Sequence, residues 1–160
     1  MTIKAGDRLP EVALQRISTG VETLDTRTLF ENRKVVIFAV PGAFTPTCSE
    51  KHLPGFVEHF DAFRERGVDV ACVAVNDPFV MQAWMQSAGV PEGLRMVADG
   101  NAELTRALGL ELDASSYGMG IRSKRFAMLI EDGVARQVFV EGPGEFRVST
   151  AENMLEAVGG

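Results

Sequence analysis

Two continuous apolar runs dominate the first half of the chain, residues 34–40 (KVVIFAV) and residues 68–75 (VDVACVAV). Runs of this length, rich in β-branched residues, predict strands that are buried on both faces. Between them, apolar residues recur at the spacing of one helical face: Leu53, Phe56, Val57, Phe60 and Phe63. A strand, a helix and a strand in this order predict a βαβ unit whose two strands are parallel.

The ends of this helix carry recognisable signals. Thr45-Pro46 joins a favoured N-cap residue to proline, which is preferred at the first helical position. Gly67 is expected to end the helix, just after two arginines in its last turn. Pro54 lies inside it, and because proline has no backbone N–H, we expect a kink near residue 50.

The rest of the chain alternates shorter elements. Asp77-Pro78 repeats the cap-and-proline signal and opens a helix that ends near Gly89, and Asp132-Gly133 between two apolar runs predicts a hairpin. The other predicted elements are a small hairpin (12–17 and 21–24), a strand (95–98), a helix (101–108), a polar loop (113–123), the hairpin strands (125–130 and 134–140) and a last helix (149–158). The last helix begins with the capping-box pattern Ser149-Thr150-Ala151-Glu152. We therefore expect one α/β domain over residues 1–160, a central mixed β-sheet with helices on both faces, compatible with a thioredoxin-like core.

Composition and charge narrow the function classes. The chain carries 16 Lys and Arg against 22 Asp and Glu, a net charge of −6, and its densest basic cluster, residues 122–125, is too small to follow a phosphate backbone. No apolar run approaches the roughly 18 residues of a membrane span, and the first ten residues lack the apolar core of a signal peptide. We expect a soluble, cytoplasmic protein without a nucleic-acid or membrane partner.

Cys48 is the residue with the most chemical information. With Thr45 as N-cap, its thiol lies in the first helical turn, where free N–H groups and the helix dipole favour a thiolate. The alternative is a buried structural cysteine, which is a common fate of this residue type. The position alone leaves both interpretations open.

The preceding loop favours the reactive thiol. Residues 41–48 read PGAFTPTC, which closely resembles the P-x-x-x-T-x-x-C signature of the peroxiredoxin family, and with the following KHLPGF the string resembles the peroxiredoxin-five branch. The similarity continues through residues 73–81 and 122–126 and the Asp132-Gly133 pair, and so covers nearly the whole chain. The resemblance implies a thioredoxin-like fold and a thiol-dependent peroxidase that needs no metal and no other cofactor.

The resemblance also implies roles for four catalytic residues. Cys48 would attack one peroxide oxygen as a thiolate and become a sulfenic acid. Thr45 would hydrogen-bond the thiolate and the peroxide, and Pro41 would shield the sulfur from water. Arg125 would stabilise the thiolate and orient the peroxide. Arg122 is the competing arginine. Strand alternation places Arg125 on the same face as Ala127 and Leu129, which is consistent with its pointing at the pocket.

Four further residues are expected around the thiol as substrate-binding or supporting groups: Gly42, Thr47, His52 and Phe44. His52 follows Cys48 by four residues and can share its helical face, so a Cys–His nucleophile pair is one interpretation. We prefer a supporting role in which His52 positions the first helical turn, and a surface histidine is the third possibility. His59 is expected on the surface, and these histidines with Cys48 do not make a credible metal site.

The second cysteine, Cys72, lies within the strand at 68–75 and is expected to be buried and inert. The resemblance places the resolving cysteine of two-Cys members near the C-terminal loop, yet residues 142–149 (GPGEFRVS) contain none. This departure favours a one-Cys cycle in which an external thiol resolves the sulfenic acid: glutathione, with or without glutaredoxin, or else thioredoxin. The family also forms a homodimer through its active-site loops, where Phe44 and Phe79 could pack.

The predicted function is reduction of hydrogen peroxide and small alkyl hydroperoxides. One alternative is a non-enzymatic peroxide sensor in which oxidation of Cys48 changes a partner interface. The other is a thioredoxin-fold binding module without a redox role. A thiol–disulfide oxidoreductase is disfavoured because Thr45 stands where a C-x-x-C motif would place the partner cysteine of Cys48.

Overall fold

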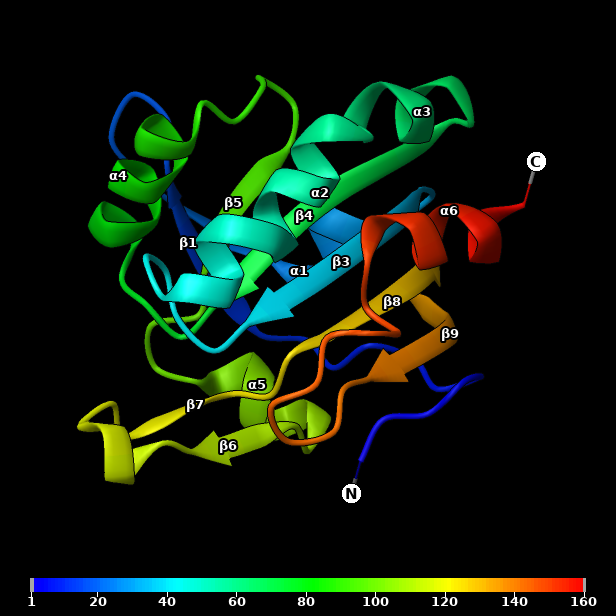
Figure 1. The fold of residues 1–160 in the computed structure, drawn as a ribbon. Helices are drawn as coiled ribbons and strands as arrows, with labels where there is room; N and C mark the ends of the chain where they lie inside the picture. Colours follow the sequence, from blue (N-terminus) through cyan, green and yellow to red (C-terminus); the bar gives the residue numbers. More distant parts are fainter. Residues whose placement is uncertain (1, 160) are drawn as a thin grey trace.

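Seven strands form the central sheet of the computed structural model, which describes residues 2–159 (Figure 1). Their spatial order is β2-β1-β5-β4-β3-β8-β9. The bounds are β1 (Ala13–Ile17), β2 (Val21–Asp25), β3 (Lys34–Val40), β4 (Val68–Ala74), β5 (Arg95–Ala98), β8 (Phe126–Glu131) and β9 (Val134–Val140). Strands β3, β4 and β5 are parallel, whereas β1, β8 and β9 pair antiparallel with their neighbours. The mixed sheet, the βαβ unit and both hairpins are as predicted.

Helices cover both faces of this sheet (Figure 1). One face packs against α2 (Leu53–Glu58), α3 (Phe60–Glu65), α4 (Pro78–Ala88) and α6 (Ala151–Val158), and the other against α1 (Thr26–Phe30) and α5 (Glu103–Leu108). The central strand β3 supplies side chains to both cores, with Val36, Phe38 and Val40 on one face and Val35, Ile37 and Ala39 on the other. Burial of both faces explains why this strand is a continuous apolar run instead of an alternating one.

Two features of the fold differ from the sequence-based expectations. The stretch predicted as a polar loop over residues 113–123 takes part in a second, two-stranded sheet of β6 (Glu111–Asp113) and β7 (Ile121–Ser123), with the short helix η2 (Ser115–Tyr117) between them. Helix α1 has no counterpart among the predicted elements. Both are too short to give a readable periodicity, and tertiary packing decides their conformation.

The last helix also begins differently from its prediction. Thr150, and not Ser149, is the N-cap of α6, because the Thr150 side chain accepts a hydrogen bond from the N–H of Asn153. The Ser149 hydroxyl instead donates to the buried carboxylate of Glu141 at 2.7 Å. This difference ties the start of α6 to the end of β9, next to the site described below.

Candidate active site

The segment that follows β3 turns sharply into a helix with an unusual first turn. Residues Cys48–His52 form a π-helical turn, η1, in which the N–H of Leu53 bonds the carbonyl of Cys48. Pro54 has no N–H and cannot donate the i→i−4 hydrogen bond of an ordinary α-helix. The wide π-helical turn therefore lies where we predicted the kink. The predicted single helix is also interrupted at His59 (φ −95°, ψ 8°), which separates α2 from α3.

The Cys48 thiol is fully buried at the start of this turn and faces a cation. Arg125, which directly precedes β8, donates from Nη2 to the sulfur at 3.1 Å. Ala127 and Leu129, on the same side of that strand, belong to the same core cluster as Cys48, so the predicted alternation is correct. The sulfur therefore has a permanent positive charge within hydrogen-bond distance.

His52 connects this arginine to the C-terminal part of the chain. Its Nε2 lies 2.9 Å from the carbonyl oxygen of Ser149, which can only accept, so Nε2 carries the proton and Nδ1 accepts from Arg125 Nη1 at 2.9 Å. Burial, joined by the charge of Arg125, lowers the pKa of His52 to about 3, against the raising effects of the Ser149 bond and the Glu141 charge. The ring is therefore neutral and fully buried, and it is not a surface histidine.

The position of His52 differs in detail from the expected one. We expected it to position the first helical turn, whereas its polar contacts are with Arg125 and Ser149. No side-chain hydrogen bond joins His52 to Cys48 within residues 2–159; Arg125 instead contacts both of them. Its role in the structure is to hold the guanidinium that contacts the thiol. His59, expected to be a plain surface residue, is partly buried and its Nε2 lies 3.0 Å from Glu152.

The loop between β3 and Cys48 is fixed by its own hydrogen bonds. Thr45 donates from its hydroxyl to the carbonyl of Gly42 at 2.7 Å, and the N–H of Ala43 donates to the Asn76 side chain at 3.0 Å. The expected bond from Thr45 to the sulfur is not among the hydrogen bonds of residues 2–159. Because the hydroxyl proton is already donated, the free lone pairs of Thr45 are available to accept from a ligand.

Gly42 occupies a position in which a side chain would be crowded. A Cβ there would lie 3.0 Å from the Met119 methyl carbon and 3.3 Å from Cγ2 of Thr45. Arg122, the competing arginine, lies behind this loop and donates to the carbonyls of Met119 and Val75. Its hydrogen bonds therefore go to segments outside the loop, and the contact with the thiol comes from Arg125.

Two aromatic side chains near the loop point outward. Phe44 adopts a left-handed backbone (φ +65°) and is 53% exposed, and Phe79, in the first turn of α4, is 64% exposed. Trp84 is buried between α4 and η1, and its Nε1 donates to the hydroxyl of Ser49 at 3.0 Å. Trp84 is thus part of the core, whereas Phe44 and Phe79 are exposed.

A cavity of about 470 Å³ opens beside Arg125. Pro41 and Thr47 line it together with the start of the C-terminal loop, so both expected site residues border the same space. The wall also includes apolar side chains, one exposed lysine and two acidic residues: Leu112, Tyr117, Pro143, Lys124, Glu141 and Glu145. A small organic molecule therefore has room next to the guanidinium.

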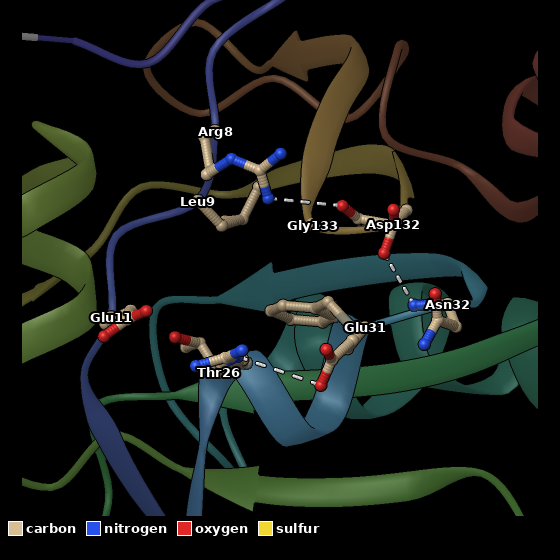
Figure 2. Close-up of a pocket in the computed structure, with 10 residues that line it drawn as sticks. Arg8, Leu9, Glu11, Thr26, Glu31, Asn32, Asp132 and Gly133 are labelled. Atoms are coloured by element: carbon tan, nitrogen blue, oxygen red, sulfur yellow. Dashed lines mark hydrogen bonds and ion pairs between the residues drawn. The ribbon is translucent and has the colours of Figure 1, made fainter.

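Figure 2 shows a different pocket, of about 330 Å³, between the N-terminal segment, α1 and the β8–β9 turn. Arg8 reaches the backbone of Asp132, whose carboxylate accepts from the N–H of Asn32. No cysteine or histidine lines this pocket. The thiol chemistry is therefore confined to the other end of the sheet.

The sequence analysis missed one residue near the site, Glu141. Its carboxylate is buried beyond the end of β9 and accepts from the N–H groups of Arg147, Val148 and Ser149 and from the Ser149 hydroxyl, at 2.7–2.9 Å. Burial alone would raise the pKa of Glu141, but these hydrogen bonds outweigh it and the net shift is downward. An acidic residue directly after an apolar strand was the available signal.

Cys72 lies in the middle of β4, fully buried and not in a disulfide, as expected. Burial raises the pKa of its thiol well above the ordinary value, which makes it a poor nucleophile.

Within residues 2–159, no helix has both the length and the apolar character needed to cross a membrane. The same residues hold no group of three or more histidine, cysteine, aspartate or glutamate side chains arranged for a metal ion.

Comparison with known proteins assigns this geometry to a family. The Redoxin family model matches residues 4–155. The chain is 49% identical to peroxiredoxin-2E-2, chloroplastic, of Oryza sativa subsp. japonica, over 98% of this chain and 73% of the relative. Its structure resembles reduced Prx3 in complex with H2O2 from Vibrio vulnificus (TM-score 0.94, 46% identity, 98% and 99% coverage) and peroxiredoxin 5 from Alvinella pompejana (TM-score 0.87, 38% identity, 98% and 97% coverage). The chain thus belongs to the peroxiredoxin family, in its peroxiredoxin-five branch, and is a thiol peroxidase that reduces peroxides.

Proposed function

We propose that Cys48 is the peroxidatic residue and that hydrogen peroxide and small alkyl hydroperoxides are its substrates. The observation that carries this proposal is the 3.1 Å contact between Arg125 Nη2 and the Cys48 sulfur. The thiolate attacks one peroxide oxygen, the O–O bond breaks, and the sulfur is oxidised to a sulfenic acid. The other oxygen leaves as hydroxide or alkoxide and takes a proton from water.

Three further residues complete the proposed mechanism. Arg125 stabilises the thiolate before attack and the negative charge on the departing oxygen afterwards. Thr45, whose proton is donated to Gly42, accepts the O–H of the peroxide and so aims the far oxygen at the sulfur. Pro41 borders the cavity beside Arg125 and limits access of water to the sulfur.

The proposed catalytic cycle uses one cysteine. Cys72 is fully buried in β4, and residues 142–149 offer no other thiol. An external thiol must then attack the sulfenic acid, forming a mixed disulfide and releasing water. Glutathione, assisted by glutaredoxin, is the proposed reductant, and thioredoxin is the alternative. The cavity beside Arg125 is lined by both cationic and acidic side chains, Lys124, Arg125 and Glu145 among them, and glutathione carries both carboxylates and an ammonium group. A reducing compartment such as the cytoplasm would supply it.

The proposed assembly is a homodimer. Phe44 and Phe79 are large apolar side chains with more than half of their surface exposed, and Phe44 holds a left-handed backbone in the loop that precedes Cys48. Burial of two such residues against a second copy would remove apolar surface from water next to the active site. Sedimentation of the wild type and of Phe79→Asp tests this assembly: the variant should be monomeric.

The central experiment is intact-mass analysis after one equivalent of hydrogen peroxide at neutral pH. For both wild type and Cys72→Ser we expect a gain of one oxygen, followed by a glutathione adduct when glutathione is added. A wild type that instead loses two hydrogens, while only the variant keeps the oxygen, would show that Cys72 resolves Cys48 and would exclude the one-Cys cycle.

A second measurement tests the role of Thr45. Thr45→Val keeps the shape of the side chain and removes the oxygen that would accept from the peroxide. The rate of sulfenic acid formation should fall strongly, while the far-UV circular dichroism stays that of the wild type. Full activity in this variant would contradict the proposed role.

A further inference from the structure

The loop between β9 and α6, residues 142–149, touches the active site at two points. The carbonyl of Ser149 accepts from His52, and the Phe146 ring lies 5.0 Å from the His52 ring, centroid to centroid. The Arg125 guanidinium carbon lies 5.8 Å from the same Phe146 ring, within the range of a cation–π contact. The orientation of the catalytic cation therefore depends on where this loop lies.

One buried carboxylate determines where the loop lies. Glu141 receives three successive backbone N–H groups, those of Arg147, Val148 and Ser149, and the Ser149 hydroxyl. Its own N–H donates to the carbonyl of Arg125 at 2.9 Å. Hydrogen bonds to a charged acceptor are about twice as strong as neutral ones, so this cluster is the strongest polar restraint on the loop.

The contacts form a continuous chain from this carboxylate to the sulfur. Glu141 fixes Ser149, the Ser149 carbonyl selects the His52 tautomer with the proton on Nε2, and Nδ1 then accepts from Arg125. With one N–H group held by His52, the other end of the guanidinium points at Cys48. A shift of the loop would release the ring, and the guanidinium would lose one of its two fixed contacts.

We propose that Glu141 is a positioning residue for peroxide reduction: it holds residues 147–149 so that the Ser149 carbonyl, through His52, keeps the Arg125 guanidinium on the Cys48 sulfur. The inference rests on the role proposed above for Arg125. Displacement of a reacting group by about 1 Å can cost up to about 100-fold in rate. We therefore expect Glu141→Gln, which puts an amide in front of N–H donors, to lower the rate constant for hydrogen peroxide by about tenfold or more.

A buried carboxylate with a similar structural task provides the matched control. Asp99 is 2% exposed and accepts from the N–H groups of Leu104 and Thr105 and from the Thr105 hydroxyl. It anchors the start of α5, and none of its hydrogen bonds within residues 2–159 reaches Glu141, Ser149, His52, Arg125 or Cys48. Asp99→Asn should lower the unfolding temperature about as much as Glu141→Gln but leave the peroxide rate constant within about twofold of the wild type.

The decisive experiment is a double-mutant cycle, with the peroxide rate constant measured by stopped-flow fluorescence. His52→Asn retains an acceptor for Arg125 near the position of Nδ1 but cannot reach Ser149. The variant therefore removes the hydrogen bond through which Ser149 acts on Arg125. In that background, Glu141→Gln should lower the rate constant by less than about twofold. Effects that multiply in the double variant, or a Glu141→Gln rate within twofold of the wild type, would overturn the inference.

Two further variants allow a conclusion if Glu141→Gln does not fold or if the role of Arg125 is itself wrong. If Glu141→Gln does not fold, Ser149→Ala removes the hydroxyl donor to Glu141 and keeps the carbonyl, and the same cycle with His52→Asn applies at a smaller effect of a fewfold. Arg125→Gln separates the two proposals. If it leaves the rate unchanged, the proposed role of Arg125 is wrong, whereas a large loss there with no effect at Glu141 rejects the positioning role alone.

Discussion

The buried, neutral state of His52 makes the stability of the protein depend on pH in a way that can be calculated. Burial, together with the charge of Arg125, lowers the pKa of His52 to about 3 in the folded protein, from 6.5 for the free side chain. The folded state therefore excludes a proton that the unfolded chain binds. Because the folded pKa is the lower of the two, stability is complete above pH 6.5 and falls as the pH decreases toward 3.

The expected size follows from the two pKa values. Each unit between them corresponds to about 1.4 kcal/mol. Between pH 7 and pH 5 the unfolded histidine becomes almost fully protonated while the folded one does not, so the free energy of unfolding should fall by about 2 kcal/mol from this residue alone. The full effect, about 5 kcal/mol, would be reached only near pH 3.

Urea unfolding at pH 7 and pH 5 measures this quantity, with Trp84, the only tryptophan, as the fluorescent reporter. His52→Asn removes the titrating ring, and the difference in pH dependence between wild type and variant isolates the contribution of His52. The chain has only one other histidine, His59, and His59→Asn is the matched control, which should retain the contribution of about 2 kcal/mol. All three proteins are compared at one concentration, since association would add its own contribution.

One result would refute this reasoning. If wild type and His52→Asn lose the same stability between pH 7 and pH 5, to within about 0.5 kcal/mol, then His52 is protonated in the folded protein or is released from its site. A protonated Nδ1 cannot accept from Arg125, so the hydrogen-bond chain from Ser149 to the thiol would then also be wrong. If His52→Asn lost more stability than the wild type between pH 7 and pH 5, the reasoning would be refuted in the same way.

Three other predictions concern the site itself. Arg125→Gln removes the cation 3.1 Å from the Cys48 sulfur and should lower the peroxide rate constant by about 100-fold or more in stopped-flow measurements, because a single charged hydrogen-bond donor at a reacting centre is worth 10²–10³. Gly42→Ala should lower the same rate constant by a smaller factor, since the new methyl group would lie 3.0 Å from the methyl carbon of Met119; an unchanged rate would show that the loop adjusts freely. Peroxide should change the emission of Trp84, whose N–H donates to the residue after Cys48, and the change should be absent in Cys48→Ser.

The strands and most helices could be predicted because their signals are local. The run of residues 34–40 is apolar on both faces because both faces are buried, and the Asp77-Pro78 and Asp132-Gly133 signals each depend on two neighbouring residues. Helix α1 and the sheet of β6 and β7 gave no such signal, since five helical residues make little more than one turn and the three-residue strands contain no apolar run. Their structure comes from packing against parts of the chain far away in sequence.

The candidate site was predicted in part for the same reason. Cys48, Thr45 and Pro41 lie within one short motif, and the strand pattern placed Arg125 on a consistent face. The direction of the Thr45 proton and the partners of His52 depend on Gly42 and Ser149 in three dimensions, which no spacing encodes. Glu141 was missed because a single acidic residue after a strand is far more often exposed to solvent than buried.

The sequence separation of the contacts at the thiol has a consequence during synthesis. Arg125 lies 77 residues after Cys48, and Ser149 lies 97 residues after His52. At about 5–20 residues per second, the ribosome needs roughly 5–20 seconds to add this stretch once the cysteine has been made. Throughout that interval the nascent chain carries Cys48 without the Arg125 contact. On the role proposed for Arg125, the thiol of the growing polypeptide therefore reacts with peroxide only as an ordinary cysteine until β8 and the loop after β9 have joined the sheet.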